Sequence, residues 1–376
     1  MKYLDNAATT YPKPSSVINA VSRCMSEYGG NPGRGSHKLA MLAAECVYDC
    51  RVKAADMFGD EDPSKVVFTL NTTYALNTAI KSLARPGDHF LMGNLEHNSV
   101  RRPIERLTTE GIIDCDVFDV RGTAEAVIHR LEKLVRPSTR AIVCAHLSNI
   151  CNIKAPIREI GEFCRRRGIA FIVDAAQSAG IEDIDLRKVR VDFLCIPGHK
   201  GLYGPQGCGI MMVSGRFPEL KTLVEGGSGI HSLDPDMPSD LPERFEAGTL
   251  PTPAIAGLSE GITFVQSLGT RTIYEHECSM WRRLYCDMRS MKGVRIYDDT
   301  PGAILLFNVD GFLPAQIATE LNRAGICVRS GLHCAPLAHQ TLGTGANGAV
   351  RVSFGAMNTA READRFVDAL YSIIHS

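Results

Sequence analysis

Short apolar runs alternate with longer amphipathic segments through the first two thirds of the 376-residue chain. The runs are rich in Val, Ile and Phe and almost continuously apolar, which is typical of strands buried on both faces of a parallel sheet. This alternation predicts a three-layer α/β domain with a mostly parallel sheet. The expected strands are 65–70, 89–94, 140–146, 169–174, 192–197 and 209–214, and the expected helices include 72–84, 98–109, 122–134 and 156–167.

The pattern changes near residue 250. Two long helical segments, 252–267 and 271–290, are followed by short apolar runs and further helices, an α+β pattern that favours a second domain. We therefore expect a large domain, 16–250, and a smaller C-terminal domain, 251–376. The N-terminal segment, 1–15, is too short to be a domain and is expected to pack on the smaller one.

Composition and charge exclude several classes of protein. The 41 basic and 42 acidic side chains leave a net charge of -1, with no electrostatic footprint for nucleic acid or an anionic membrane. No apolar run reaches the roughly 20 residues that cross a bilayer, and no signal peptide is visible. We expect a cytoplasmic protein that acts on a small molecule. The 13 cysteines, an odd number, favour a reducing compartment over disulfides.

Lys200 is the first candidate for chemistry. It follows a predicted buried strand and a Pro-Gly-His bend in IPGHKGLYGPQGCG (196–209). Burial at a strand end lowers the pKa of a lysine, which suits a side chain that forms a Schiff base with a carbonyl cofactor. Because a lone loop lysine is ordinarily solvated, this interpretation depends on neighbouring motifs.

Asp174 ends another predicted strand, with Gln177 three residues later. A carboxylate at a strand's carboxyl end faces the crevice where α/β sheets bind ligands. Paired with a pyridine nitrogen, it would keep that nitrogen protonated and make the ring an electron sink. A helix N-cap is the alternative for Asp174 alone. Its position 26 residues before Lys200 favours the cofactor interpretation.

Two further motifs follow predicted strands. Thr72 and Thr73 begin a predicted helix, where free amides and hydroxyls could hold a phosphate or serve as an ordinary cap. This segment does not match the G-x-x-x-x-G-K-[ST] nucleotide loop. His97 could stack on a cofactor ring and shuttle protons, although a lone histidine is more often structural.

Together these motifs resemble the class V aminotransferase superfamily, fold-type I pyridoxal 5'-phosphate (PLP) enzymes, and within it the cysteine desulfurases. The short loop and the histidine directly before Cys334 are similar to the group II (SufS-like) branch, which is related to selenocysteine lyases. The resemblance spans practically the whole chain. Its motifs are YLDNAATT (3–10), NPGRGSH (31–37), Thr72–Thr73, Glu96–His97, Ser148–Asn149, Asp174–Gln177, Gly198–Lys200, FEAGT (245–249), RSGLHCA (329–335) and RVSF (351–354).

The resemblance implies a PLP-dependent cysteine desulfurase that converts L-cysteine to L-alanine and carries the sulfur as a persulfide on Cys334. Lys200 would bind the cofactor covalently and later move the substrate's α-proton. Arg329, His333 or the bound substrate could favour the Cys334 thiolate. The alternative for Cys334 is an inert buried thiol, as expected for most of the other cysteines.

The resemblance also implies the remaining site residues. Asp174 would pair with the pyridine nitrogen, Gln177 with the phenolic oxygen, and His97 would stack on the ring. Thr72, Thr73 and His199 would hold the phosphate, joined by Thr249 from the second subunit of a homodimer. Asn149 and Arg351 would receive the substrate carboxylate, Arg351 through two parallel hydrogen bonds, and Arg329 would also bind the substrate. A sulfur-acceptor protein is the expected partner, and no metal is expected.

Two features depart from the family pattern. Pro197 stands where the family usually offers a hydroxyl to the phosphate, so one hydrogen bond of about 1 kcal/mol should be missing unless another group substitutes. The chain also begins almost at the DNAATT motif, without the N-terminal helix of longer group II enzymes. Both departures concern the subtype rather than PLP binding.

Other functions remain open. Within the same superfamily, the alternatives are a selenocysteine lyase, a cysteine lyase or a transaminase, and Cys334 argues only against the last. A thiol-rich metal or redox protein would draw on Cys46 and Cys50, at helical spacing with Cys24 upstream, but the chain has no C-x-x-C pair. A catalytically silent scaffold would be expected to lack Lys200 or Asp174, and both are present.

Overall fold

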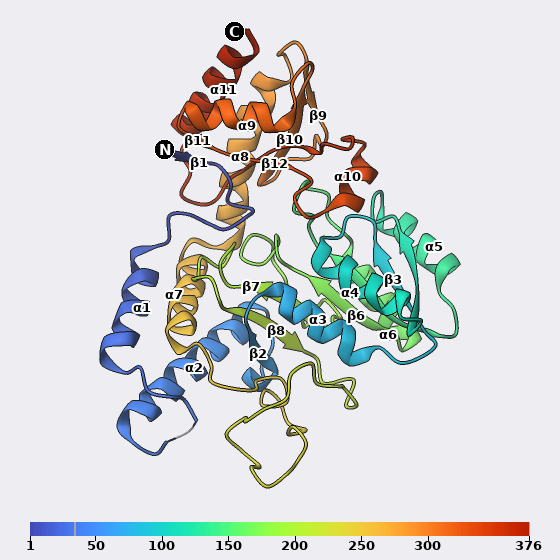
Figure 1. Ribbon diagram of the computed structural model, residues 1–376, viewed down its shortest axis with the longest axis vertical. Coiled ribbons are helices and arrows are strands. Elements are labelled where there is room, and N and C mark those ends of the chain that lie inside the picture. The colour runs from blue at the N-terminus through green and yellow to red at the C-terminus, as the bar shows by residue number, and fades with distance from the viewer. Residues whose placement is uncertain (34, 376) are drawn as a thin grey trace.

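The structure, a computed structural model, describes residues 1–33 and 35–375; Arg34, within the NPGRGSH motif, lies outside the described residues. A seven-stranded sheet of order β2-β8-β7-β6-β5-β3-β4 forms the centre of its larger part (Figure 1). Only β8 runs against its neighbours among these strands. In chain order they are β2 (Val66–Thr69), β3 (Asp88–Gly93), β4 (Ile113–Phe118), β5 (Thr139–Ala145), β6 (Ala170–Asp174), β7 (Phe193–Pro197) and β8 (Gly209–Val213).

Helices cover both faces of this sheet, which confirms the predicted three-layer architecture. Neighbouring strand residues point to opposite faces, so Ile172 packs in one core and Val173 in the other. One face is covered by α3 (Thr72–Leu83) and α4 (Asn98–Thr109). The other is covered by α2 (Lys38–Met57), α5 (Ala124–Leu134), α6 (Ile157–Arg167) and α7 (Thr252–Leu268). A short 3₁₀ helix, η1 (Pro63–Lys65), precedes β2.

Strand β4 is the element of the large sheet that the sequence did not predict. It pairs only with β3 and forms the sheet edge, so its middle residues are partly exposed. An edge strand needs no continuous apolar run, and Asp114 and Asp116 are tolerated there. A continuous apolar run, the pattern of a buried strand, is therefore absent from β4.

A second sheet, of order β12-β13-β10-β9, is antiparallel and forms the smaller part of the molecule. Side chains such as Trp281, Phe307 and Phe366 fill a separate core there. The strands are β9 (Val294–Ile296), β10 (Ile304–Val309), β12 (Arg329–Gly331) and β13 (Ala349–Ser353), and the helices are α8 (Thr270–Met288), α9 (Pro314–Arg323) and α11 (Ala360–His375). The short helix α10 (Pro336–Leu342) instead packs through Ala338 on the core of the large sheet.

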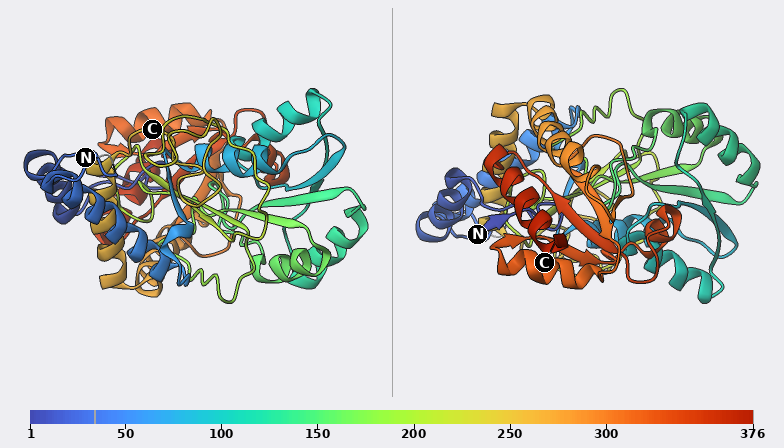
Figure 2. Two further views of the ribbon diagram at one scale, coloured as in Figure 1. Left: turned by 90° about the horizontal axis from the view of Figure 1, so that it is seen from below. Right: turned by 90° about the horizontal axis from the view of Figure 1, so that it is seen from above.

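The N-terminal segment joins this smaller part. Strand β1 (Lys2–Tyr3) pairs in parallel with β11 (Ile326–Cys327), and Leu4 is buried in the same core. The chain then crosses to α1 (Ser15–Glu27), which packs on α7 beside the large sheet (Figures 1 and 2). No helix in the described ranges is long and apolar enough to span a membrane.

Helix α7 packs with the large sheet, although the sequence pattern grouped it with the second part of the chain. Its buried residues Ile255, Leu258 and Ile262 belong to the core of the large sheet, and its neighbours are α1 and α2. The change in pattern marks where the α/β alternation stops. The division of the chain into domains beyond this packing remains a prediction.

Candidate active site

A cavity of about 220 Å³ lies at the carboxyl ends of the parallel strands. The loops after β2, β3, β5, β6 and β7 contribute to it, because parallel strands end at one edge of the sheet and their loops meet there. Eight of the residues expected from the sequence line the cavity together. They are Thr72, Thr73, His97, Asn149, Asp174, Gln177, His199 and Lys200.

Lys200 lies in the turn that follows β7. Its burial lowers the pKa of the amine to about 8, and the positive charges of Arg351 and Arg329 act in the same direction. The negative charge of Asp174 opposes the shift. A neutral amine, the nucleophilic form, is therefore accessible near neutral pH.

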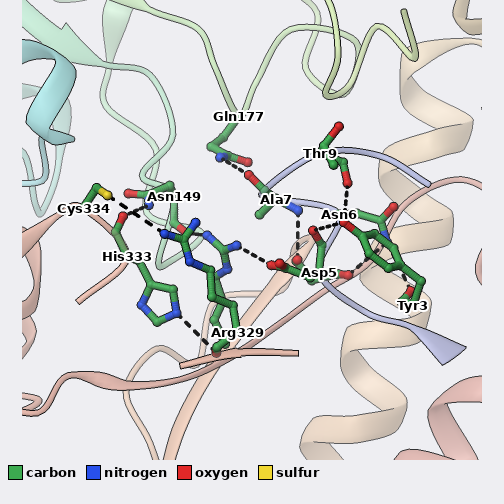
Figure 3. A network of polar contacts seen from close by, with 12 residues as sticks. Tyr3, Asp5, Asn6, Ala7, Thr9, Asn149, Gln177, Arg329, His333 and Cys334 are labelled. Carbon is green, nitrogen blue, oxygen red and sulfur yellow. Dashed lines mark hydrogen bonds and ion pairs between the residues drawn. The ribbon is translucent and has the colours of Figure 1, made fainter. Parts of the chain in front are cut away.

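Asp174 ends β6 and is buried. Burial raises the pKa of its carboxyl group, while a hydrogen bond from the Ala176 amide, 2.8 Å from Oδ1, and the charge of Lys200 oppose that rise. Turns rather than a helix follow β6, so Asp174 does not cap a helix. Nearby, Gln177 Nε2 donates to the Ala7 carbonyl at 3.0 Å, which ties its side chain to the N-terminal segment (Figure 3).

His97 caps α4 and is held in one tautomer. Its Nδ1 accepts the Ser99 amide at 3.1 Å, so the proton resides on Nε2. Burial and the charges of Lys200 and Arg329 lower the His97 pKa to about 4, and the ring is neutral. The Ser99 hydroxyl lies 2.6 Å from Nδ1 and 2.9 Å from Thr73 Oγ1. Ser99 was not predicted as a site residue. Its position two residues after His97, at the start of a helix, would have indicated a hydrogen bond to the histidine ring.

The start of α3 provides donors suited to an anion. Asn71 is the N-cap, and its Oδ1 accepts the Tyr74 amide at 3.0 Å. The earlier amides of the first turn have no intrahelical partner. Thr72 Oγ1 is buried, with no hydrogen-bond partner in the described part of the chain. Pro197 lines the same cavity and offers neither a hydroxyl nor an amide hydrogen.

His199 and Thr249 lie in different surroundings. His199 lines the cavity, and its Nδ1 is 3.1 Å from Thr9 Oγ1. Burial lowers its pKa to about 4, aided by the charges of Lys200 and Lys13. Thr249 is exposed, does not line the cavity, and accepts a hydrogen bond from Asn31 Nδ2 at 3.2 Å. One chain alone therefore does not bring Thr249 to the other candidates.

Cys334 lies in the loop between β12 and α10, with its side chain exposed. Arg329 is beside it, 4.0 Å from Nη2 to the sulfur (Figure 3). Two hydrogen bonds tie this loop to residues next to the cavity. The Asn98 amide donates to the Cys334 carbonyl at 2.7 Å, and Asn149 Nδ2 donates to the His333 carbonyl at 2.8 Å.

His333 is the neighbour of Cys334 that does not contact the thiol. Its ring is buried, and burial together with the charge of Arg351 lowers its pKa to about 2. A neutral ring turned into the protein cannot stabilise a thiolate by charge. Of the two side chains considered from the sequence, Arg329 is therefore the one placed to do so.

Arg351, in β13, is only 1% exposed. Its Nη1 donates to the Asn149 carbonyl at 2.9 Å, and its Nη2 pairs with Asp5 Oδ1 at 2.6 Å. The Nε atom has no partner in the described ranges. Asp5 belongs to the YLDNAATT motif, but the sequence did not predict its pairing with Arg351.

Asn149 lines the cavity and is also tied to the Cys334 loop. Its Nδ2 donates one of two hydrogens to the His333 carbonyl, so the second hydrogen stays available to an acceptor such as a carboxylate. Its Oδ1 has no partner in the described residues. The expected role of Asn149, receiving the substrate carboxylate together with Arg351, stays a prediction.

Comparisons with known proteins agree with this geometry. The chain matches the aminotransferase class-V family over residues 2–366. A probable cysteine desulfurase of Methanothermobacter thermautotrophicus is 35% identical, over 99% of this chain and 94% of its own length. One from Vibrio cholerae is 30% identical over 99% and 93%.

Solved structures give the same result. The apo structure of a cysteine desulfurase from Thermococcus onnurineus NA1 is similar with a TM-score of 0.90 at 29% identity, covering 100% of this chain and 94% of that one. The cysteine desulfurase CsdA (S-sulfonic acid) from Escherichia coli also has a TM-score of 0.90, over 99% of this chain and 94% of its own. At 24% identity, that second likeness concerns the fold alone.

Proposed function

Because the chain belongs to the class-V aminotransferase family, we propose that it is a PLP-dependent cysteine desulfurase that converts L-cysteine to L-alanine. The observation that carries the proposal is an exposed thiol, Cys334, hydrogen-bonded through its loop to the walls of a cavity that contains Lys200 and Asp174. The names of the similar proteins, which align over nearly their whole length, support the same activity.

The residues around the cavity fit PLP. The buried, unpaired Thr72 hydroxyl and the free amides at the start of α3 suit its phosphate, and Asp174 suits its pyridine nitrogen. Gln177 and the neutral ring of His97 line the same cavity. When bound, PLP supplies an electron sink that stabilises negative charge at the substrate's α-carbon.

The chain's own side chains perform the other tasks. Lys200, as a neutral amine, takes the α-proton. Arg351 receives the substrate carboxylate with the guanidinium N–H groups that do not bind Asn149 or Asp5. The Cys334 thiolate, favoured by Arg329, attacks the substrate sulfur. An S–S bond forms as the Cβ–S bond breaks, and the electron pair stays on the substrate, whose Cβ takes up a proton. The α-carbon regains a proton from Lys200, which gives alanine and leaves the persulfide on Cys334.

Exposure of Cys334 supports transfer of the sulfur to an acceptor protein, because a persulfide at the surface can be reached by a second thiol. We also propose that the enzyme is a homodimer, in which Thr249 of the partner subunit reaches the phosphate. Exposed apolar side chains on α1 and α2, next to the Asn31–Thr249 hydrogen bond, support this assembly.

The test uses purified protein supplied with PLP. Borohydride reduction of one sample should leave the cofactor's mass on Lys200. In a separate, unreduced sample, L-cysteine should yield alanine and one added sulfur on Cys334, seen by mass spectrometry. Cys334→Ala should keep the visible absorbance and lose both products. Cys286→Ala removes the other exposed thiol in the described ranges and serves as the matched control.

A protein that stays colourless with PLP, or full desulfurase activity in Cys334→Ala, would end the proposal. The same assay with L-selenocysteine separates the related activity. Release of selenide together with no sulfur on Cys334 would replace the desulfurase by a selenocysteine lyase.

A further inference from the structure

A buried chain of hydrogen bonds lies behind Cys334. The imidazoles of His333 and His339 are 3% and 2% exposed, and their ring planes are nearly parallel, at 14°, with centroids 5.3 Å apart. His333 Nδ1 is 3.1 Å from His339 Nε2. The chain ends at the Arg329 carbonyl, 3.3 Å from His333 Nε2, and at Thr344 Oγ1, 2.7 Å from His339 Nδ1.

The partners fix where each proton lies. The Arg329 carbonyl can only accept, so His333 carries its proton on Nε2 and leaves Nδ1 bare. His339 must then donate from Nε2, and its own bare Nδ1 accepts the Thr344 hydroxyl at 2.7 Å. The other acceptor near this hydroxyl, the His339 carbonyl, is farther away at 3.4 Å. Both imidazoles are therefore neutral Nε2–H tautomers, and every hydrogen bond of the series is donated in the direction from Thr344 to the Arg329 carbonyl. Burial, which lowers the pKa of His333 to about 2 and of His339 to about 4, agrees with this state.

These hydrogen bonds stabilise an energetically unfavourable backbone conformation at His333 and Cys334. His333 and Cys334 have φ angles of 49° and 55°, in the left-handed region that non-glycine residues enter at a cost of about 1–2 kcal/mol each. In this conformation the His333 ring points into the protein while the Cys334 side chain is exposed beside Arg329 (Figure 3). Ala335 and Ala338, both fully buried, secure the start of α10 just beyond.

We propose that His339 and Thr344 are positioning residues for Cys334: by fixing the tautomer of His333 they hold the thiol beside the Arg329 guanidinium. Neither residue lines the cavity, so they act through His333 and not on the substrate. This inference deepens the proposed function, because the positioned thiol is the one that would accept sulfur. Its geometric part, the orientation of the thiol, can be tested without that function.

The test compares two replacements of one histidine in a Cys286→Ala background, where Cys334 is the exposed thiol. His339→Gln keeps an N–H near the position of Nε2, so it can still donate to His333. His339→Leu has no donor. We expect His339→Leu to slow alkylation of Cys334 at pH 7 about tenfold, because the thiol leaves its position beside Arg329. His339→Gln should recover most of the rate.

Three further measurements test the inference. Nitrogen-15 NMR should report Nε2–H tautomers for His333 and His339 in the unsubstituted protein. Thr344→Val, which keeps the side-chain shape, should slow alkylation about two- to threefold even if His339→Leu does not fold. With L-cysteine, His339→Leu should lower kcat while KM and the visible absorbance of the cofactor stay unchanged.

An Nδ1–H tautomer on either histidine, or an unchanged alkylation rate in folded His339→Leu or Thr344→Val, would overturn the inference. If the unsubstituted protein forms no persulfide from L-cysteine, the proposed function fails. The tautomers and the alkylation rates would still decide whether the histidine chain positions the thiol.

Discussion

At the residue scale, the site depends on how burial and neighbouring charges set proton positions. Lys200 and His97 lie in one cavity, burial lowers the pKa of both, and the charge of Lys200 lowers the pKa of His97 further. Asp174 remains the nearby carboxyl group whose negative charge opposes the lowered pKa of Lys200. The result is a nucleophilic amine next to a neutral ring.

Cofactor capture by apoenzyme should therefore depend on pH through Lys200. With a pKa of about 8, the neutral amine at pH 7 is about 200- to 300-fold more abundant than on an ordinary lysine. The capture rate should rise as pH increases through 8 and then level off, because only the neutral form attacks. Stopped-flow absorbance after mixing apoenzyme with PLP measures it. A rate that still climbs above pH 10 would contradict the lowered pKa.

Asp5 is the counter-charge of a buried guanidinium. Asp5→Asn leaves Arg351 without a full negative partner and should lower the free energy of unfolding by about 3 kcal/mol. Added L-alanine, whose carboxylate can replace the lost charge, should stabilise the variant more than the unsubstituted protein. Thermal unfolding with and without L-alanine measures both effects.

The control for this prediction is Asp364→Asn. Asp364 pairs with Arg283 on the exposed surface, where solvent screens the charges, so its replacement should change stability little. Equal destabilisation by the two substitutions would contradict a special role for the buried pair.

At the element scale, helix α7 contacts the glycine-rich segment that follows Lys200 and so fixes the position of that segment. A Cβ on Gly261 of α7 would lie 2.2 Å from the Leu202 carbonyl oxygen and 2.9 Å from the Gly204 nitrogen. Only glycine permits this approach. The same contact explains why α7 belongs with the large sheet.

Gly261→Ala should consequently destabilise the protein. Helix propensity alone predicts a gain of about 0.5–1 kcal/mol when glycine becomes alanine in a helix. The backbone contact predicts the opposite sign, a loss of about 1–3 kcal/mol from overpacking, together with weaker PLP binding. Denaturant unfolding and PLP titration test this. A more stable Gly261→Ala variant would refute the contact.

At the scale of the whole molecule, the two cores come together around the site. Strands of the large sheet present Lys200 and Asp174, whereas Cys334, Arg329 and Arg351 belong to the smaller part. The N-terminal segment links them, because Asp5 pairs with Arg351 and Ala7 accepts a hydrogen bond from Gln177. The site therefore forms only when both parts are folded.

The proposed homodimer is tested at this scale. Light scattering should give about twice the 41.0 kDa mass of the chain. Met25→Asp, on the exposed apolar surface of α1, should shift the protein toward monomer and weaken PLP binding, because Thr249 of the partner subunit no longer reaches the phosphate. Tyr371→Asp, an exposed site on α11, should do neither. A dimer unaffected by Met25→Asp would exclude this interface.

The sequence by itself determined the layered fold and most of the cavity. Continuous apolar runs identify strands buried on both faces, and the end of such a strand must lie at the ligand edge of a parallel sheet. That reasoning found Asp174, Lys200, His97 and the Thr72–Thr73 turn. It missed β4, because an exposed edge strand carries no such run.

Only the tertiary structure decided the pairings between distant segments. Asp5 and Arg351 are 346 positions apart, and Asn149 meets the His333 carbonyl across 184. No local pattern encodes which atom of an amide or imidazole is already occupied. That occupancy depends on packing, which joins Asn149 Nδ2 to the His333 carbonyl, turns the His333 ring inward and leaves Arg329 beside the thiol.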